Sequence, residues 1–166
     1  MSNALKNRIG QGVDAHQLVA GTPLVIGGVS IPFPSGSKGH SDGDVLYHAI
    51  VDAILGALAL GDIGQHFPSD DEQWRGIPSR KFLEHTKDLI QEKGYTAVNI
   101  DATVILQTPE LRLYISEMRE NIARFLSISI DAVSVKATTT DRLGFTGSGD
   151  GILATAVALL TKKNGN

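Results

Sequence analysis

Residues 39–48 read Gly39-His40-Ser41-Asp42-Gly43-Asp44-Val45-Leu46-Tyr47-His48 and join a dense polar group to the start of an apolar repeat. Ser41 suits the cap of a helix, and Asp44, three positions later, resembles the acidic partner of a capping box. Apolar residues then recur at helical spacing, which predicts a helix over residues 42–60. His48 lies one turn after Asp44, on the same face of this helix.

A second polar pair, Asp14 and His16, ends a segment predicted to be a strand over residues 8–16. Alternation along a strand places both side chains on the same face. A catalytic metal centre commonly takes three protein ligands, and one carboxylate with two imidazoles is a suitable set. We therefore expect Asp14, His16 and His48 to hold one metal ion.

A structural interpretation of the same residues also exists. His48 would then lie on a half-buried helix face, and Asp14 would cap a loop. The neighbours of His48 favour the functional interpretation, because crowding His40, Asp42 and Asp44 into one short segment brings no benefit to folding.

His40 and Ser41 come just before the predicted helix, where backbone N–H groups and the positive end of the helix favour an anion. We expect a phosphate there, although Ser41 also serves as a plain helix cap. Asp44 has two interpretations of equal weight. It contacts a substrate hydroxyl or a metal ligand, or it simply places a favourable charge at the helix N-terminus.

The rest of the chain combines strands and helices. Gly27-Gly28 between two short apolar runs predicts a hairpin over residues 24–31. The other predicted elements are helices at 79–93 and 109–126, strands at 98–107, 132–138 and 151–162, and loops at 32–39, 65–78 and 141–151. Periodicity alone leaves a helix open for the last apolar segment. The fold class is α/β of the α+β type, a mixed four-stranded sheet with helices on one face and a small hairpin.

The face of the sheet without helices should be apolar and should pack against other copies of the chain. The residues assigned to this face are Val104, Val133, Val135, Ile152, Ala154 and Ala156.

A second candidate site lies at the end of the strand at 132–138, which runs into Thr138-Thr139-Thr140-Asp141. Three hydroxyls and a carboxylate suit a phosphate with a hard cation such as Mg²⁺. High β-propensity followed by a turn explains the same residues without a ligand. Phe145, a few positions on, either packs under a ligand or anchors its loop.

The composition is that of a globular protein, with 166 residues, 42% hydrophobic and 20% charged residues and a net charge of −3. We expect a single domain over residues 8–163, preceded by a tail or expression remnant at 1–7. The charge argues against nucleic acid and membrane surfaces as partners, and no apolar run is long enough to span a membrane. A cytoplasmic enzyme is expected. Without cysteine, any metal site must use histidines and carboxylates.

From Arg8 to Lys162 the chain resembles the 2-C-methyl-D-erythritol 2,4-cyclodiphosphate synthase family. The block His-Ser-Asp-Gly-Asp followed by Asp-Ile-Gly is highly specific, whereas single pieces would be weak evidence. The shared motifs are Gly10-x-Gly12-x-Asp14-x-His16, His40-Ser41-Asp42-Gly43-Asp44, His48, Gly61-Asp62-Ile63-Gly64, Phe67-Pro68, Lys136-Ala137-Thr138-Thr139-Thr140 and Leu143-Gly144-Phe145-Thr146-Gly147.

This resemblance implies an enzyme of the non-mevalonate isoprenoid pathway. Its substrate would be 4-diphosphocytidyl-2-C-methyl-D-erythritol 2-phosphate, whose 2-phosphate attacks the β-phosphorus and expels CMP to form the cyclic 2,4-diphosphate. It also implies a homotrimer with active sites between neighbouring subunits, and two kinds of ion, Zn²⁺ and either Mg²⁺ or Mn²⁺.

The resemblance assigns roles residue by residue. Asp14, His16 and His48 would bind zinc, and Asp141 would bind the second ion. His40 and Thr139 would stabilise the transition state, with Ser41 on phosphate. The polyol would lie against Asp44 and residues 62–64, and the cytidine end against residues 106–112 and 138–141 of the neighbouring subunit. The full substrate-binding set is Asp14, Ala15, His16, His40, Ser41, Asp44, Asp62, Ile63, Gly64, Phe67, Pro68, Ser69, Asp70, Asp71, Leu106, Gln107, Thr108, Pro109, Glu110, Leu111, Arg112, Thr138, Thr139, Thr140, Asp141, Phe145 and Ser148.

Four positions depart from the family pattern. Glu110 stands where a basic residue is expected, and Gln11 where a histidine is common. Asp141 is one methylene shorter than the usual glutamate. Ser148 replaces an arginine that, in the family, lies near the trimer axis and can meet an isoprenoid diphosphate.

Two other functions compete with a synthase. Two histidines and a carboxylate also describe a non-haem iron oxygenase, but such an enzyme expects a closed all-β scaffold, and this chain predicts three helices. The other is a non-catalytic binder of nucleotides or isoprenoid diphosphates, against which the metal-binding residues argue.

Overall fold

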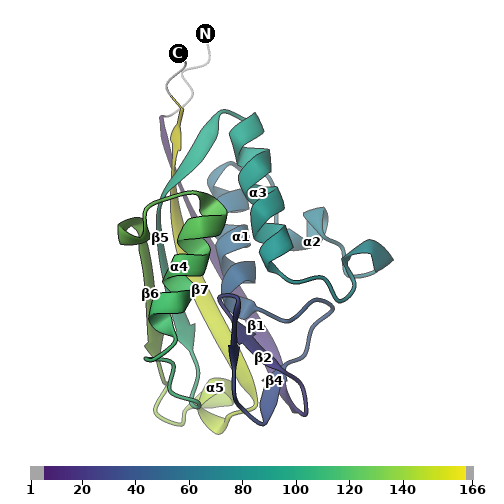
Figure 1. The fold of residues 1–166 in the computed structure, drawn as a ribbon. Coiled ribbons are helices and arrows are strands. Elements are labelled where there is room, and N and C mark those ends of the chain that lie inside the picture. Colours follow the sequence, from purple (N-terminus) through teal and green to yellow (C-terminus); the bar gives the residue numbers. More distant parts are fainter. Residues whose placement is uncertain (1–5, 164–166) are drawn as a thin grey trace.

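The computed structural model describes residues 6–163, which form one mixed sheet with helices on one face (Figure 1). The strand order is β4-β1-β7-β5-β6, in which only β5 and β6 run parallel. The five strands are β1 (Asn7–Ala20), β4 (Ser35–Ser37), β5 (Tyr95–Ile105), β6 (Val133–Thr138) and β7 (Gly151–Lys162). A separate two-stranded hairpin is made by β2 (Leu24–Ile26) and β3 (Val29–Ile31).

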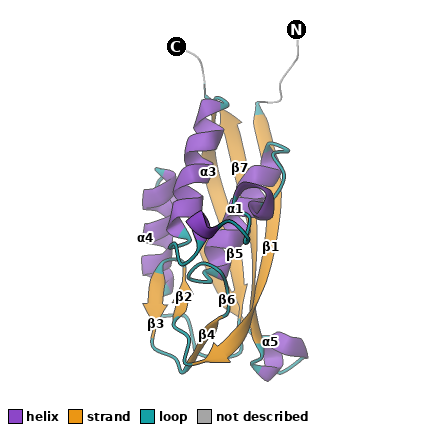
Figure 2. Ribbon diagram, turned by 90° about the vertical axis from the view of Figure 1, so that its right-hand side faces the viewer, coloured by secondary structure: helices purple, strands orange, loops and turns teal. Residues whose placement is uncertain are grey.

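The longer helices lie together on one face of the sheet, as the turned view in Figure 2 shows. They are α1 (Val45–Ala57), α3 (Arg80–Glu92) and α4 (Ile115–Leu126). Short helical turns complete the chain: α2 (Ile63–His66), η1 (Glu72–Trp74), η2 (Ile130–Ala132) and α5 (Gly144–Ser148). Alternation along the strands directs one set of side chains into the core under these helices.

α1 packs unusually close to β1, and two glycines make this possible. A Cβ atom at Gly10 would lie 1.9 Å from the carbonyl oxygen of Ala53, and one at Gly12 would lie 2.0 Å from that of Ala49. Any larger residue would therefore push the helix away from the strand. The close approach brings the first turns of α1 beside the helix-facing residues that follow Gly12 on β1.

The hairpin β2–β3 is fastened to the N-terminus of α1 by Asp44. Its carboxylate accepts hydrogen bonds from the N–H groups of Gly27 (2.9 Å) and Gly28 (2.7 Å) in the hairpin turn. It also caps the helix by accepting from the N–H of Tyr47 at 3.1 Å. Asp44 is fully buried, so it joins two elements inside the core.

Several predicted boundaries were wrong. β4 lies in the segment predicted to be a loop, so the main sheet has five strands and not four. The helix after Asp44 begins at Val45, and its N-cap is Asp44 and not Ser41. α4 begins at Ile115 and not near Pro109. The last apolar segment is a strand, as predicted.

The predicted tail at residues 1–7 is too long at its C-terminal end; its first five residues lie outside the described part of the chain. Asn7 already belongs to β1 and pairs with Thr161 of β7. Lys6 also takes part, since its carbonyl accepts the N–H of Lys162 at 2.8 Å.

The assignment of residues to the open face of the sheet was also wrong. Val104, Val133, Val135, Ile152, Ala154 and Ala156 all face the helices and belong to the core. The opposite face instead presents Ile9, Val13 and Val157, which are 72%, 50% and 42% exposed. Strand alternation gives the sheet two faces, and the prediction had chosen the wrong one as the open face. Among residues 6–163, no helix combines the length and apolar character needed to cross a membrane.

Candidate metal centre and adjoining cavity

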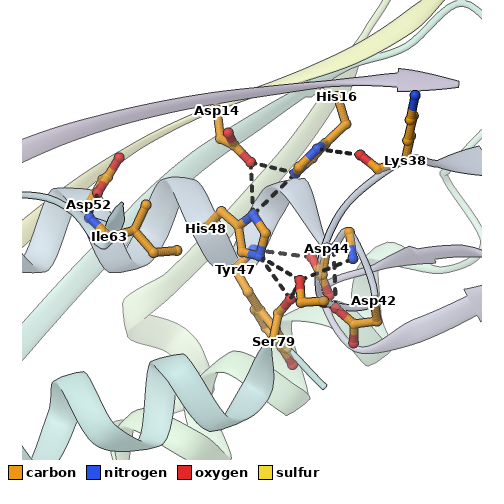
Figure 3. A network of polar contacts seen from close by, with 12 residues as sticks. Asp14, His16, Lys38, Asp42, Asp44, Tyr47, His48, Asp52, Ile63 and Ser79 are labelled. Carbon is orange, nitrogen blue, oxygen red and sulfur yellow. Dashed lines mark hydrogen bonds and ion pairs between the residues drawn. The ribbon is translucent and has the colours of Figure 1, made fainter. Parts of the chain in front are cut away.

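Three side chains from two elements meet where α1 crosses β1 (Figure 3). Asp14 and His16 come from the helix-facing side of β1, and His48 comes from the second turn of α1. Asp14 Oδ2 lies 2.9 Å from His16 Nε2 and 3.0 Å from His48 Nδ1. The two ring nitrogens are 3.1 Å apart. The three residues that the sequence predicted to act together therefore do converge.

The outer nitrogen of each imidazole has its own partner, which indicates where its proton lies. His16 Nδ1 is 3.0 Å from the carbonyl oxygen of Lys38, which can only accept a hydrogen bond. His16 therefore carries its proton on Nδ1 and turns the lone pair of Nε2 inward. His48 Nε2 lies 2.9 Å from the hydroxyl of Ser79 and 3.2 Å from that of Ser41.

The electrostatics of the group favour a positive charge among these atoms. Burial opposes ionisation of Asp14, but hydrogen bonds with His16 and His48 outweigh it and lower the pKa of Asp14. Burial likewise opposes charge on His16, yet the hydrogen bond and attraction to Asp14 raise the pKa of His16. With the outer partners satisfied, a carboxylate oxygen and two imidazole lone pairs face one another. Such a set repels itself unless a cation or a proton lies between.

The group fits a divalent transition metal such as zinc. Tetrahedral ligands at about 2.0–2.2 Å from a zinc ion lie about 3.3 Å apart, within a few tenths of an ångström of the distances here. Carboxylate and imidazole are both ordinary zinc ligands, and each histidine has the outer hydrogen bond usual for metal-bound imidazole. His48 is only 9% exposed, so its ring is held in place by the core.

A cavity of about 690 Å³ opens beside the three ligands. Its polar side includes both His16 and His48 and the segment 38–41 that precedes α1. Its other walls come from residues 63–64, 67–70, Trp74 and Phe82. This is the size of a small-molecule site, and polar side chains and aromatic rings both line it.

The apolar wall of this cavity is a cluster of aromatic rings. Phe67 stacks on Phe82 at 4.5 Å between centroids and meets Trp74 edge-on at 5.0 Å. Phe82 in turn lies 5.9 Å from the ring of His48. The wall therefore shields the metal ligands from solvent on one side and gives the cavity a fixed shape.

A family model described as the YgbB family matches residues 7–161. The chain belongs to the YgbB family. Among curated proteins of similar sequence, the 2-C-methyl-D-erythritol 2,4-cyclodiphosphate synthase of Chloroherpeton thalassium is 53% identical and aligns over 93% of this chain and 99% of its own length. The synthase of Geobacter metallireducens is 55% identical, over 94% and 99% of the two chains.

Solved structures agree with the YgbB family assignment. The bifunctional IspDF from Campylobacter jejuni is 39% identical, with a TM-score of 0.91 over 95% of this chain. The match spans only 43% of that longer protein. IspF from Plasmodium falciparum, solved as a complex with CDP, is 38% identical with a TM-score of 0.84, covering 95% of this chain and 97% of that one.

Most residues predicted from the shared YgbB motifs near His48 lie around the cavity. The cavity-lining members of the predicted set are His16, His40, Ser41, Ile63, Gly64, Phe67, Pro68, Ser69 and Asp70. Asp62 and Asp71 lie beside them as caps of short helical turns, where each carboxylate accepts a backbone N–H. Ala15 is exposed, and by strand alternation it points to the opposite face of the sheet from Asp14 and His16.

Asp44 does not occupy the predicted position. The fully buried carboxylate faces the hairpin turn, and three backbone N–H groups use its oxygens. A direct contact between Asp44 and a substrate hydroxyl or a metal ligand is therefore not supported. The helix-terminus interpretation, which the sequence had left open, describes it better.

The second group of predicted residues lies elsewhere in the subunit. Residues 106–111 surround a cavity of about 240 Å³ together with residues 137–139. Thr140, Asp141 and Phe145 line another, of about 560 Å³. Arg112 pairs with Glu110 at 3.3 Å, and Ser148 hydrogen-bonds the carboxylate of Asp150. Within the described chain, residues 106–112 and 138–141 do not line the cavity beside His48.

Sequence reasoning missed Trp74, Phe82 and Ser79. Trp74 and Phe82 lie in a predicted loop and in the first turn of a predicted helix, where aromatic residues look like ordinary core. Ser79 is the first residue of the helix predicted at 79–93, where a serine looks like an ordinary helix cap. The signal that could have found Trp74 is that it is the single tryptophan of the chain, in the same predicted loop as residues 67–71, which were expected to line the pocket.

Proposed function

We propose that this chain closes 4-diphosphocytidyl-2-C-methyl-D-erythritol 2-phosphate to 2-C-methyl-D-erythritol 2,4-cyclodiphosphate, as a step of the non-mevalonate isoprenoid pathway. An oxygen of the 2-phosphate forms a bond to the β-phosphorus. The bond from that phosphorus to the oxygen bridging to the α-phosphate breaks, and CMP leaves with the electron pair. The substrate is a water-soluble nucleotide, which suits a cytoplasmic enzyme.

One observation carries the proposal: a carboxylate and two imidazoles converge beside a cavity, in a chain of the YgbB family. Its curated relatives bear the name of this synthase, and they align with this chain over nearly their full length. The CDP complex of the Plasmodium falciparum relative supports a cytidine diphosphate moiety in the substrate. The iron-oxygenase alternative loses support, because residues 6–163 form an open sheet covered by helices and not a closed β scaffold.

Asp14, His16 and His48 would hold zinc, and Asp141 would hold Mg²⁺ or Mn²⁺. Bound there, the two ions would withdraw electron density from the attacked phosphorus and neutralise the departing phosphate. Asp141 is exposed, and its backbone has a φ of 51°, a left-handed conformation that directs the turn after Thr140. A hydroxyl–carboxylate hydrogen bond of 3.3 Å joins it to Thr139.

The chain's other residues would align the substrate. The nucleophile is already an anion, so the reaction needs positioning more than a strong base. His40 and Thr139 would donate to the phosphoryl oxygens in the transition state, and Ser41 would bind a phosphate. Residues 62–64 and 67–71 would enclose the polyol, with the aromatic wall excluding water from the closing ring.

We further propose a homotrimer in which each active site forms between neighbouring subunits. The separation of the two groups of predicted residues within one subunit supports this arrangement. The residues that would bind the cytidine end and the second ion are Leu106–Arg112 and Thr138–Asp141, and they would reach the metal cavity of the next copy. The exposed Ile9, Val13 and Val157 on the open face of the sheet also favour association.

The direct test is incubation of the purified protein with the cytidyl substrate, Zn²⁺ and Mg²⁺, following CMP and the cyclic product by chromatography. We expect stoichiometric release of both, and loss of both when a chelator removes the metals. A folded, zinc-loaded protein that releases no CMP would contradict the proposed reaction.

A further inference from the structure

We infer that Ser79, held by Asp42, is a positioning residue that keeps the metal-binding nitrogen of His48 free of its proton. The inference rests on the proposed metal centre, and it adds an outer pair of residues that the family motifs do not assign. Neither residue would touch the substrate or the metal. Both would act through the imidazole of His48.

The geometry around Ser79 connects three segments of the chain (Figure 3). Ser79 precedes α3 and is fully buried, with 0% of its surface exposed. Its hydroxyl lies 2.9 Å from His48 Nε2 and 3.0 Å from the hydroxyl of Ser41. It also donates a short hydrogen bond to the carboxylate of the partly buried Asp42.

The direction of these hydrogen bonds follows from what each group is able to donate. An ionised carboxylate only accepts, so Asp42 takes the single proton of the Ser79 hydroxyl. The Ser79 oxygen then has only lone pairs left to offer, and these accept the Nε2–H of His48. A neutral imidazole has one proton, so placing it on Nε2 leaves Nδ1 with a free lone pair beside Asp14 and His16.

The conformation of Ser79 supports this role independently of the distances. Serine at a helix N-cap ordinarily accepts a hydrogen bond from the first turn of its helix. Ser79 occupies the N-cap of α3, but its backbone is helical (φ −60°, ψ −18°) and its side chain makes no capping hydrogen bond. The hydroxyl is turned away from its own helix and toward His48 and Asp42.

His16 shows the same principle with a different partner. Its outer nitrogen donates to the backbone carbonyl of Lys38, which no substitution removes. His48 depends instead on side chains, and the shorter of its two outer contacts, 2.9 Å to Ser79 against 3.2 Å to Ser41, can be removed by mutation. Outer partners of metal-bound histidines typically contribute about 10- to 100-fold to metal affinity or activity.

The test compares zinc dissociation constants of the wild type, Ser79→Ala and Asp42→Ala, measured by competition with a chelating dye. We expect Ser79→Ala to weaken zinc binding by about 10- to 100-fold, and Asp42→Ala, which removes the acceptor of the Ser79 proton, to weaken it in the same direction. In NMR spectra of the zinc-loaded proteins, the His48 Nε2–H signal should move upfield and exchange faster with water in Ser79→Ala. A purely structural role for the serine would not change that proton.

Thr86→Val is the matched control, because Thr86 is equally buried in the same helix and its hydroxyl makes no hydrogen bond. We expect the control to bind zinc like the wild type. If Ser79→Ala fails to fold, Asp42→Ala carries the test, since Asp42 is partly exposed. Wild-type zinc affinity with an unchanged Nε2–H signal in either folded variant overturns the inference alone. A wild type that binds no zinc overturns the proposed metal centre together with it.

Discussion

His48 is the residue on which the proposed metal centre most depends, because it is the only one of the three proposed ligands supplied by a helix. Replacing it by alanine leaves Asp14 and His16 as two ligands on one strand. We expect His48→Ala to lose more zinc affinity than the roughly 10- to 100-fold that an outer partner contributes, and to lose CMP release with it. Metal analysis after dialysis and the chromatographic assay measure both effects.

The exposed His85 on α3 provides the control for this substitution. His85→Ala removes an imidazole without touching the metal ligands, so zinc content should stay at the wild-type level. Circular dichroism should show both variants folded. Full turnover by folded His48→Ala would mean that the metal ligands have been assigned wrongly.

Asp44 makes a prediction about stability rather than catalysis. Burial raises the pKa of Asp44 to about 6, from an ordinary value of 3.8, although backbone N–H groups partly oppose the shift. Between these values the folded protein keeps a proton that the unfolded chain has lost. The free energy of unfolding contributed by Asp44 therefore falls as pH rises through this window, by up to about 1.4 kcal/mol per pH unit.

Asp44→Asn removes this titration and leaves one amide oxygen for the N–H groups of Gly27 and Gly28. We expect the variant to be less stable by about 1–3 kcal/mol, because a buried N–H loses its acceptor. Urea unfolding from about pH 4 to about pH 7 should show the wild type losing its advantage as pH rises. Parallel pH profiles for the two proteins would refute the assignment, since all other carboxyls are common to both.

At the residue scale, sequence predicted the convergence of Asp14, His16 and His48 well and their supporting residues poorly. Asp14, His16 and His48 were predictable because few roles other than metal binding explain that combination of residue types. The role of Asp44 depends on which N–H groups the hairpin brings to it, and no local pattern contains that information. Ser79 looks like any helix cap until the fold places His48 beside it, 31 positions away in the chain.

At the scale of elements, the contact between β1 and α1 sets the geometry of the proposed metal centre. Gly12→Ala would place a Cβ atom 2.0 Å from the carbonyl oxygen of Ala49, so the helix must move outward. We expect the free energy of unfolding to fall by at least about 1–3 kcal/mol. Zinc binding should also weaken, because His48 moves with α1. Chemical denaturation and the dye competition assay measure the two effects.

Gly56→Ala is the control for that prediction, because Gly56 is an exposed glycine of α1, the helix that packs against Gly12. Its added Cβ would have only the carbonyl oxygen of Gln11 nearby, at 3.8 Å. Alanine is favoured over glycine within a helix, so this variant should gain about 1 kcal/mol and keep its zinc affinity. Equal stability of the two variants would show that the close packing at Gly12 is not needed.

How well each element can be predicted from the sequence depends on its length and on how regular its apolar pattern is. β7 and α3 carry long, regular apolar repeats and were located within a few residues. β4 has three residues, Ser35–Ser37, and is defined only by its pairing with β1. α5 and the turns around residues 63–74 are similarly short, so their structure comes from tertiary contacts. Helix α4 begins later than expected because Pro109 does not open it: bends and a turn occupy residues 107–114 before Ile115.

At the scale of the molecule, the open face of the sheet and the divided site lead to one arrangement. Sequence predicted that an apolar face would remain but chose the residues that α1 and α4 in fact cover. Alternation gives two equivalent faces, and only the packed helices decide which is buried. The exposed residues Ile9, Val13 and Val157 are therefore the ones to consider for contact between copies.

Mixing two inactive variants tests whether each active site needs two subunits. His48→Ala damages the zinc side of the site, and Asp141→Asn damages the side proposed to come from the neighbouring copy. In a ring, each contact joins two different patches, so a random mixture forms sites in which both halves are intact. Co-refolding equal amounts should restore about a quarter of the wild-type CMP release, whereas each variant alone stays inactive.

The same mixture also separates association from chemistry. Adding Val157→Glu to both variants places a carboxylate on the open face, where its burial between copies would be costly. We expect these double variants to elute as monomers and to regain no activity when mixed. Mixtures of the two single variants that stay inactive although light scattering shows mixed assemblies would place the whole site within one subunit. The separated cavities around residues 106–111 and 140–146 would then need another explanation, such as a rearrangement of the chain when substrate binds.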